Sequence, residues 1–211
     1  MEYAAATLAW ALETIGGAKY GFIGGSAISI IARQYDLPGR QTEDLDLIVQ
    51  PTTMSADLLS NRLTTDESVR KHFMSKKDGY VDKPHVVVAR ADEVMIYIPI
   101  EIFDWQVWPN RERYYNLDWT EIKPCYLPVD NRRALFLTPG WLLRQKILSY
   151  MGRGGMKKQS DLEDIESLGR VLALRRETII IREEGEVEAL KVGLRADDAP
   201  ELQEFVRCEA V

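Results

Sequence analysis

Two aspartates separated by a single residue, Asp44 and Asp46, lie in the short segment DLDLIV. Side chains alternate between the two faces of a strand, so an extended conformation places both carboxylates on one face. Two carboxylates this close repel each other unless one takes up a proton or a cation lies between them. The pair therefore predicts a site for a hard divalent cation, Mg²⁺ or Mn²⁺, which prefers oxygen ligands.

A third acidic ligand is expected from the segment VMIYIPIEIFD, residues 94–104. Its isoleucines recur at every second position and so share a buried face, whereas Glu101 points to the opposite face. Asp104 is in register with the isoleucines, beyond the expected end of the strand. Glu101 is therefore the preferred third ligand, and Asp104 is the reserve.

A phosphate site is expected beside these acids. Gly24 and Gly25 allow the backbone to approach a ligand closely. Ser26 opens a segment with helical spacing, and the amides at a helix N-terminus favour a phosphate group. Adjacent metal and phosphate sites predict a nucleoside triphosphate site, although a helix cap is the better explanation of Ser26 taken alone.

Bulk properties limit the function classes. The chain has 211 residues, of which 45% are apolar and 28% charged, so a packed core is expected. The net charge of −6 argues against an extended nucleic-acid surface. The two cysteines do not have zinc-site spacing, and no apolar run is long enough for a membrane span. The N-terminal segment looks like an amphipathic helix rather than a signal peptide. Together these features indicate a cytoplasmic protein without a membrane partner.

Hydrophobic periodicity and turn residues predict the elements that position these groups. Helices are expected over residues 2–15, 26–35, 54–63, 67–74 and 139–151, and from Ser160 onward, where Ser160 and Glu163 form a capping box. Strands are expected over 20–23, 44–49, 85–89 and 94–103. Residues 104–133 look irregular, and the tail after residue 178 contains a strand or two and a short helix after Pro200. The result is an α/β (α+β) fold, with a small mixed sheet flanked by helices in residues 1–130 and a helical part over 131–211.

The ordered motifs resemble the nucleotidyltransferase superfamily, which has the DNA polymerase β-like fold, and among its members the AbiEii-type and related minimal nucleotidyltransferases. The matching residues are Gly24-Gly25-Ser26, then Arg40-x-Thr42-x-Asp44-x-Asp46, then an acid on a later strand. The segment LTPGWLLRQKILSYMGRGGMKKQSDLEDIESL resembles their helical module. The resemblance implies nucleotide-binding roles for further residues: Arg40, Thr42, Lys146, Lys158 and Asp161. In one departure from the pattern, Glu101 stands where Asp is commoner, without the usual basic residue just ahead of it.

Several of these residues also have ordinary structural interpretations. Arg40 could serve the turn after Pro38-Gly39, Lys146 could be a solvated helix residue, and Lys158 could lie in an exposed loop. Asp161 could act on a helix N-terminus through the helix dipole. The aromatic segment over residues 105–126 is better explained by packing than by stacking on a base.

The sequence therefore predicts transfer of a nucleoside monophosphate from a nucleoside triphosphate to an unidentified acceptor hydroxyl, on a protein, a small molecule or an RNA end. One alternative is a nucleotide-binding or regulatory module that has lost catalysis and works with a protein partner. Another is recruitment of the acids as general acid and base for other small-molecule chemistry.

Overall fold

The structure, a computed structural model, describes residues 1–89, 94–104, 119–181 and 206–208. Contacts group the chain into two compact units. The first comprises Met1–Ala27 and Gln41–Leu137, and the second comprises Ile28–Arg40 and Thr138–Val211.

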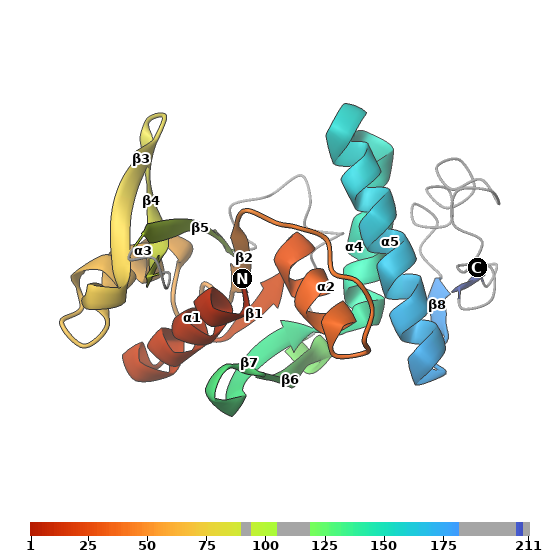
Figure 1. The fold of residues 1–211 in the computed structure, drawn as a ribbon, viewed down its shortest axis with the longest axis horizontal. Coiled ribbons are helices and arrows are strands. Elements are labelled where there is room, and N and C mark those ends of the chain that lie inside the picture. Colours follow the sequence, from red (N-terminus) through yellow and green to blue (C-terminus); the bar gives the residue numbers. More distant parts are fainter. Residues whose placement is uncertain (90–93, 105–118, 182–205, 209–211) are drawn as a thin grey trace. The chain divides into compact units, whose positions relative to one another are not determined.

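The first unit is built on a seven-stranded mixed sheet with the strand order β3-β4-β5-β2-β1-β7-β6 (Figure 1). Its strands are β1 (Tyr20–Ile23), β2 (Leu45–Val49), β3 (Phe73–Asp78), β4 (Val81–Ala89), β5 (Met95–Asp104), β6 (Ile122–Leu127) and β7 (Arg132–Leu137). Strand β2 pairs antiparallel with β1 and parallel with β5. The central strands β1 and β2 are almost wholly buried, as their apolar sequences indicate.

Two helices complete the first unit. Helix α1 (Glu2–Ile15) is rich in alanine, a strong helix former, and buries eight side chains. Helix α3 (Ala56–Thr65) begins after Ser55, whose hydroxyl accepts a hydrogen bond from the amide of Leu58 at 3.3 Å. Helix α2 (Gly24–Arg33) starts in the first unit and continues into the second.

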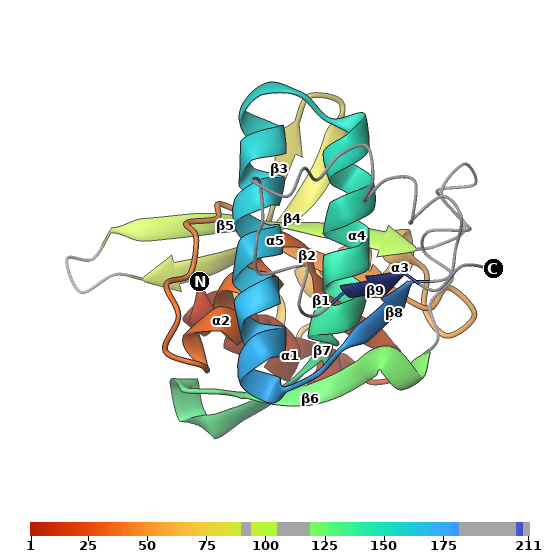
Figure 2. The ribbon, with the colours of Figure 1, turned by 90° about the vertical axis from the view of Figure 1, so that its right-hand side faces the viewer.

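The second unit contains α4 (Pro139–Gly152), α5 (Gly155–Arg175) and a parallel pair of short strands, β8 (Ile179–Ile181) and β9 (Val206–Cys208). Helices α4 and α5 lie side by side (Figure 2). Thr138 caps α4 by accepting a hydrogen bond from the amide of Trp141, and Pro139 occupies the first helical position.

The expected fold class is confirmed: a mixed sheet is flanked by helices, and five α-helices lie within the described ranges. The expected bounds of α1 and β1 are also confirmed. The division into domains near residue 130 stays a prediction. Among the described residues, no helix has both the length and the apolar character needed to cross a bilayer.

The helix expected over residues 67–74 is wrong. Only a single 3₁₀ turn, Arg70–His72, forms there, and strand β3 starts at Phe73. Phe73 is buried and pairs with Val86 of β4. Sheet pairing with β4, the next strand of the hairpin, outweighs the weak helix propensity of the basic residues.

The irregular region expected over residues 104–133 is also wrong where the structure describes it. Strand β5 includes Asp104, and β6 and β7 form an antiparallel hairpin. Asp130 and Asn131, at the tip, have φ of 54° and 47°, which these two residue types tolerate better than most. The Asp-Asn dipeptide was therefore a missed turn signal. Residues 105–118, and with them most of the aromatic segment, lie outside the described residues.

The capping box predicted at Ser160 is wrong as well. Helix α5 already begins at Gly155, and the Ser160 hydroxyl donates to the carbonyl of Met156 at 3.1 Å. A serine inside a helix can bond back to the preceding turn, so its side chain is no proof of a helix start. The short helix expected after Pro200 falls largely outside the described residues, and Val206–Cys208 form a strand.

Candidate metal and nucleotide site

Neighbouring strands bring three carboxylates together in the first unit. The parallel register of β2 and β5 pairs Asp46 with Glu101, and Asp44 lies just ahead of β2. Ligand oxygens of Asp44, Asp46 and Glu101 all lie within 4.8 Å of one another, and all three residues are half-buried. We call these three residues the acidic triad. Its donor set of hard oxygens at close spacing is the kind that Mg²⁺ uses.

Gly24 places the start of helix α2 directly against the triad. The helix begins at Gly24 itself rather than after the glycines, and Gly24 has φ of 72°. A Cβ at this position would lie 2.8 Å from Cβ of Asp46 and would overlap the Asp46 carboxylate. Glycine is therefore required for this close approach, which brings the positive end of the helix dipole to the acids.

Ser26 is the third residue of α2 and therefore does not cap this helix. Its side chain is fully buried, and its hydroxyl has no hydrogen-bond partner among the described residues. A buried polar group without a partner is uncommon and costs free energy, so it requires an explanation. Gly25 is buried beside it, and Thr42 is half-buried on the segment that leads to β2.

A basic residue that the sequence motifs did not indicate, Lys83 of β4, lies at the triad. Its Nζ lies 2.8 Å from Oε1 of Glu101 and 2.7 Å from Oδ2 of Asp78. The hydrogen bonds to Asp78 and Glu101 raise the pKa of Lys83 above its ordinary value. The motif lacks a basic residue just ahead of Glu101, and a neighbouring strand supplies one instead.

The reserve ligand, Asp104, is placed elsewhere. Its buried carboxylate accepts a hydrogen bond from the amide of Ala56, the first residue of α3, at 3.4 Å. A carboxylate at a helix N-terminus stabilises the helix through the orphan amides and the dipole. Among the described residues, Asp104 is not part of the group that could hold a metal.

A cavity of about 230 Å³ opens beside Glu101. It lies within the first unit, between the first turns of α3, the start of β4 and the end of β5, and Ser60, Lys83 and Phe103 are among its lining residues. A space of this size holds a side chain or a small-molecule group. It is too small for a folded macromolecule.

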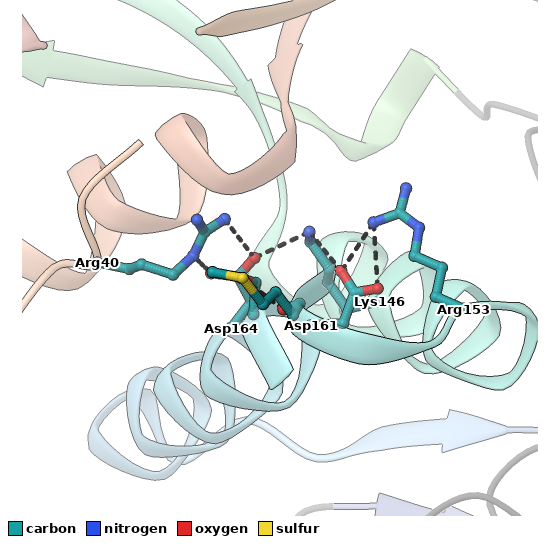
Figure 3. Close-up of polar contacts among 7 residues, drawn as sticks. Arg40, Lys146, Arg153, Asp161 and Asp164 are labelled. Atoms are coloured by element: carbon teal, nitrogen blue, oxygen red, sulfur yellow. Dashed lines mark hydrogen bonds and ion pairs between the residues drawn. The ribbon is translucent and has the colours of Figure 1, made fainter. Parts of the chain in front are cut away.

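The second unit contains an ion cluster (Figure 3), in which the buried carboxylates of Asp161 and Asp164 pair with Arg40, Lys146 and Arg153. Lys146 Nζ lies 2.9 Å from Oδ1 of Asp161 and 2.8 Å from Oδ2 of Asp164. Arg40 donates two hydrogen bonds of 3.1 Å to the Asp164 carboxylate, and Arg153 donates to both oxygens of Asp161. Each carboxylate therefore has an arginine of its own and shares Lys146.

Burial and charge act in opposite directions on the pKa values of Lys146 and Arg40. Burial by itself lowers the pKa of Lys146, but Asp164 and Asp161 more than offset it, so the pKa is raised. The same balance, with Asp164 as the main partner, raises the pKa of Arg40. Lys146 and Arg40 are therefore charged at neutral pH.

The cluster changes how the predicted nucleotide residues are interpreted. Lys146 is not a solvated lysine, because its side chain is only 13% exposed and paired with two acids. Asp161 is the seventh residue of α5, too far along to serve its N-terminus. Lys158 lies on α5 rather than in a loop, with Nζ 4.4 Å from the centroid of the Tyr150 ring. Their roles toward a nucleotide stay predictions.

No family model matches the chain, and no curated protein matches it. Its fold is similar to the crystal structure of an antigenic nucleotidyltransferase-like protein from Paracoccidioides brasiliensis. The TM-score is 0.77 at 24% sequence identity, and the match covers 98% of this chain and 94% of the other. The chain thus has a nucleotidyltransferase-like fold, whereas the finer resemblance to AbiEii-type proteins stays a prediction.

Proposed function

We propose that the protein transfers a nucleotidyl group from a nucleoside triphosphate to an acceptor hydroxyl. The observation that carries the proposal is the acidic triad of Asp44, Asp46 and Glu101 on neighbouring strands, directly against the first residue of α2. Metal ligands and a helix N-terminus together suit a triphosphate with its cation, because each element binds one part of that ligand.

The chain's own groups have distinct roles in this proposal. The triad would hold Mg²⁺ or Mn²⁺, which supplies Lewis acidity at phosphoryl oxygens and lowers the pKa of an acceptor hydroxyl. The amides of Gly25 and Ser26 bind phosphate oxygens, and the unpartnered hydroxyl of Ser26 is the candidate additional donor. The triad alone would repel a triphosphate, so nucleotide binding must depend on the cation.

Acceptor and location also belong to the proposal. The cavity beside Glu101 is where an acceptor hydroxyl could reach the triad, and its size favours a small molecule or a protein side chain over a long nucleic acid. Thr42 and Lys158 keep the nucleotide-binding roles that the resemblance implies. For Arg40, Lys146 and Asp161, the ion pairs favour a structural role. We place the protein in the cytoplasm, with no membrane partner.

A calorimetric titration with a non-hydrolysable nucleoside triphosphate, with and without Mg²⁺, tests the proposal. We expect saturable binding that requires Mg²⁺ and is lost in Asp46→Asn. The matched control is Glu67→Gln, which removes an exposed acid of the same unit and should bind like the wild type. Binding that is independent of Mg²⁺, or that survives Asp46→Asn, would show that the triad does not bind the nucleotide.

A nucleotide-binding module without catalysis is the second candidate. It is favoured by the ion pair between Lys83 and Glu101, because an ammonium group occupies one oxygen of a required metal ligand. This candidate predicts Mg²⁺-dependent binding of the triphosphate without release of pyrophosphate in the presence of any acceptor. A pyrophosphate assay on the wild type and Asp44→Asn distinguishes the two candidates.

A further inference from the structure

Lys83 connects the acidic triad to an acid outside it. Its ammonium lies between Glu101, a triad member, and Asp78 at the end of β3. The side chain of Asp78 is 64% exposed, against 34% for Glu101. One flexible cation is therefore held by one acid inside the site and another at the surface.

We propose that Lys83 is an exchangeable counter-ion of the triad. Its ammonium neutralises Glu101 while no divalent cation is bound, and a cation that enters the triad displaces it onto Asp78. This inference rests on the proposed function, since it concerns the same cation site.

Charge repulsion within the triad supports this role of Lys83. Three carboxylates with ligand oxygens within 4.8 Å of one another repel strongly, and an ammonium 2.8 Å from one of them relieves that repulsion. A divalent cation on Glu101 would provide the same relief and would repel the ammonium. The two cations therefore compete for one carboxylate.

The geometry around Lys83 also allows the exchange. Lysine carries a compact charge on a flexible four-carbon stem, so Nζ can leave Glu101 by rotating side-chain bonds, without movement of β4. Asp78 already holds the ammonium at 2.7 Å, so the displaced group keeps a partner. The β3–β4 register pairs Asp78 with Val81, which anchors Asp78 next to the strand that carries Lys83.

The exchange couples the metal to the nucleotide. Displacing Lys83 costs part of the binding free energy of a cation that enters alone. A triphosphate brings negative charge that offsets this cost. Cation and triphosphate should therefore bind together more readily than the cation binds by itself.

The test measures Mn²⁺ affinity at low ionic strength, from the electron paramagnetic resonance signal of free Mn²⁺. Lys83→Met should bind Mn²⁺ about tenfold more tightly than the wild type. The repulsion between a divalent and a monovalent charge about 6 Å apart, even at the dielectric of water, lowers the affinity by roughly this factor. Lys83→Arg, which keeps the charge, should stay near the wild type. Lys77→Met removes an exposed lysine from β3 of the same hairpin and should change the affinity far less.

A double-mutant cycle separates exchange from simple proximity of charge. Asp78→Asn should weaken Mn²⁺ binding in the wild type, because the displaced ammonium loses its second partner. The same change should have little effect in Lys83→Met, where there is no ammonium to move. Lys83→Gln is the replacement if Lys83→Met lowers the melting temperature measured by circular dichroism.

The outcomes distinguish this inference from the proposed function. If Glu101→Gln weakens Mn²⁺ binding but Lys83→Met leaves it unchanged or weaker, the counter-ion role is overturned and the metal site stands. An equal effect of Asp78→Asn in both backgrounds would also overturn the exchange. If no variant, including the wild type, binds Mn²⁺ saturably, the proposed metal site fails together with this inference.

Discussion

Replacing Lys146 with methionine tests whether the ion cluster holds the second unit together. The change removes the one ammonium that contacts both Asp161 and Asp164, whose side chains are only 1% and 2% exposed. Removing one partner of a buried ion pair usually costs about 3–5 kcal/mol, because a buried charge is left behind. Here each carboxylate keeps an arginine, Arg153 or Arg40, so we expect a loss of about 3 kcal/mol, at the lower end of that range.

The assay is urea unfolding followed by circular dichroism, on the wild type, Lys146→Met and the matched control Lys157→Met. Lys157 is an exposed lysine of α5, and its replacement should change the free energy of unfolding by less than about 0.5 kcal/mol. Adding Asp164→Asn to Lys146→Met should cost less than the sum of the two single changes, since both act on one network.

The pH dependence of this effect has a defined sign. The pKa of Lys146 is raised above its ordinary value of 10.5 in the folded protein. The stabilising contribution of Lys146 is therefore complete below about pH 10.5 and is lost as the pH rises through the raised value. The difference between wild type and Lys146→Met should be constant near neutral pH and shrink in strong alkali. A loss below about 1 kcal/mol at pH 7, or one matched by Lys157→Met, would refute the reasoning.

Two further predictions concern the first unit. Gly24→Ala should destabilise the protein by more than about 2 kcal/mol and weaken Mn²⁺ binding, because the new Cβ overlaps the Asp46 carboxylate. Gly79→Ala is the control, because Gly79 also has a positive φ, 63°, but has open space around it. This control introduces backbone strain without a steric overlap and should cost about 1 kcal/mol. Equal costs by urea unfolding would contradict the close approach. Burial, aided by Glu13, raises the pKa of Tyr20 to about 12, so its contribution to stability is complete below pH 10 and is lost as the pH rises through 12. Between pH 10 and 12, the free energy of unfolding of Tyr20→Phe should therefore fall less steeply with pH than that of the wild type. The two slopes should differ by about 1.4 kcal/mol per pH unit. If urea unfolding gives parallel pH profiles for the two proteins, the raised pKa is wrong.

Local patterns were sufficient for many elements. The apolar spacing of α1 and the cap and proline of α4 predicted these helices closely, because helix starts and faces depend on neighbours within a few residues. The alternation of side chains along a strand also favoured Glu101 over Asp104 as the companion of the aspartate pair. The structure brings Glu101 to that pair and uses Asp104 at the start of α3.

Tertiary pairing decided what local patterns could not. The helix expected over residues 67–74 included the first two residues of β3, Phe73 and Met74, because a local pattern does not show that Phe73 is buried and pairs with Val86 of β4. Ser160 looked like a helix cap because the sequence does not show that α5 has already begun at Gly155.

The sequence by itself determined which residues could do chemistry: an acid pair with period-two spacing, a glycine pair ahead of a helix, and a third acid on a later strand. Only the tertiary structure decided the partners of those residues. Lys83 reaches Glu101 from the neighbouring strand, and Arg40 meets Asp164 across 124 residues of chain. The strength of an ion pair depends on the distance in space between the two charged groups, and the order of charges along the sequence does not give that distance.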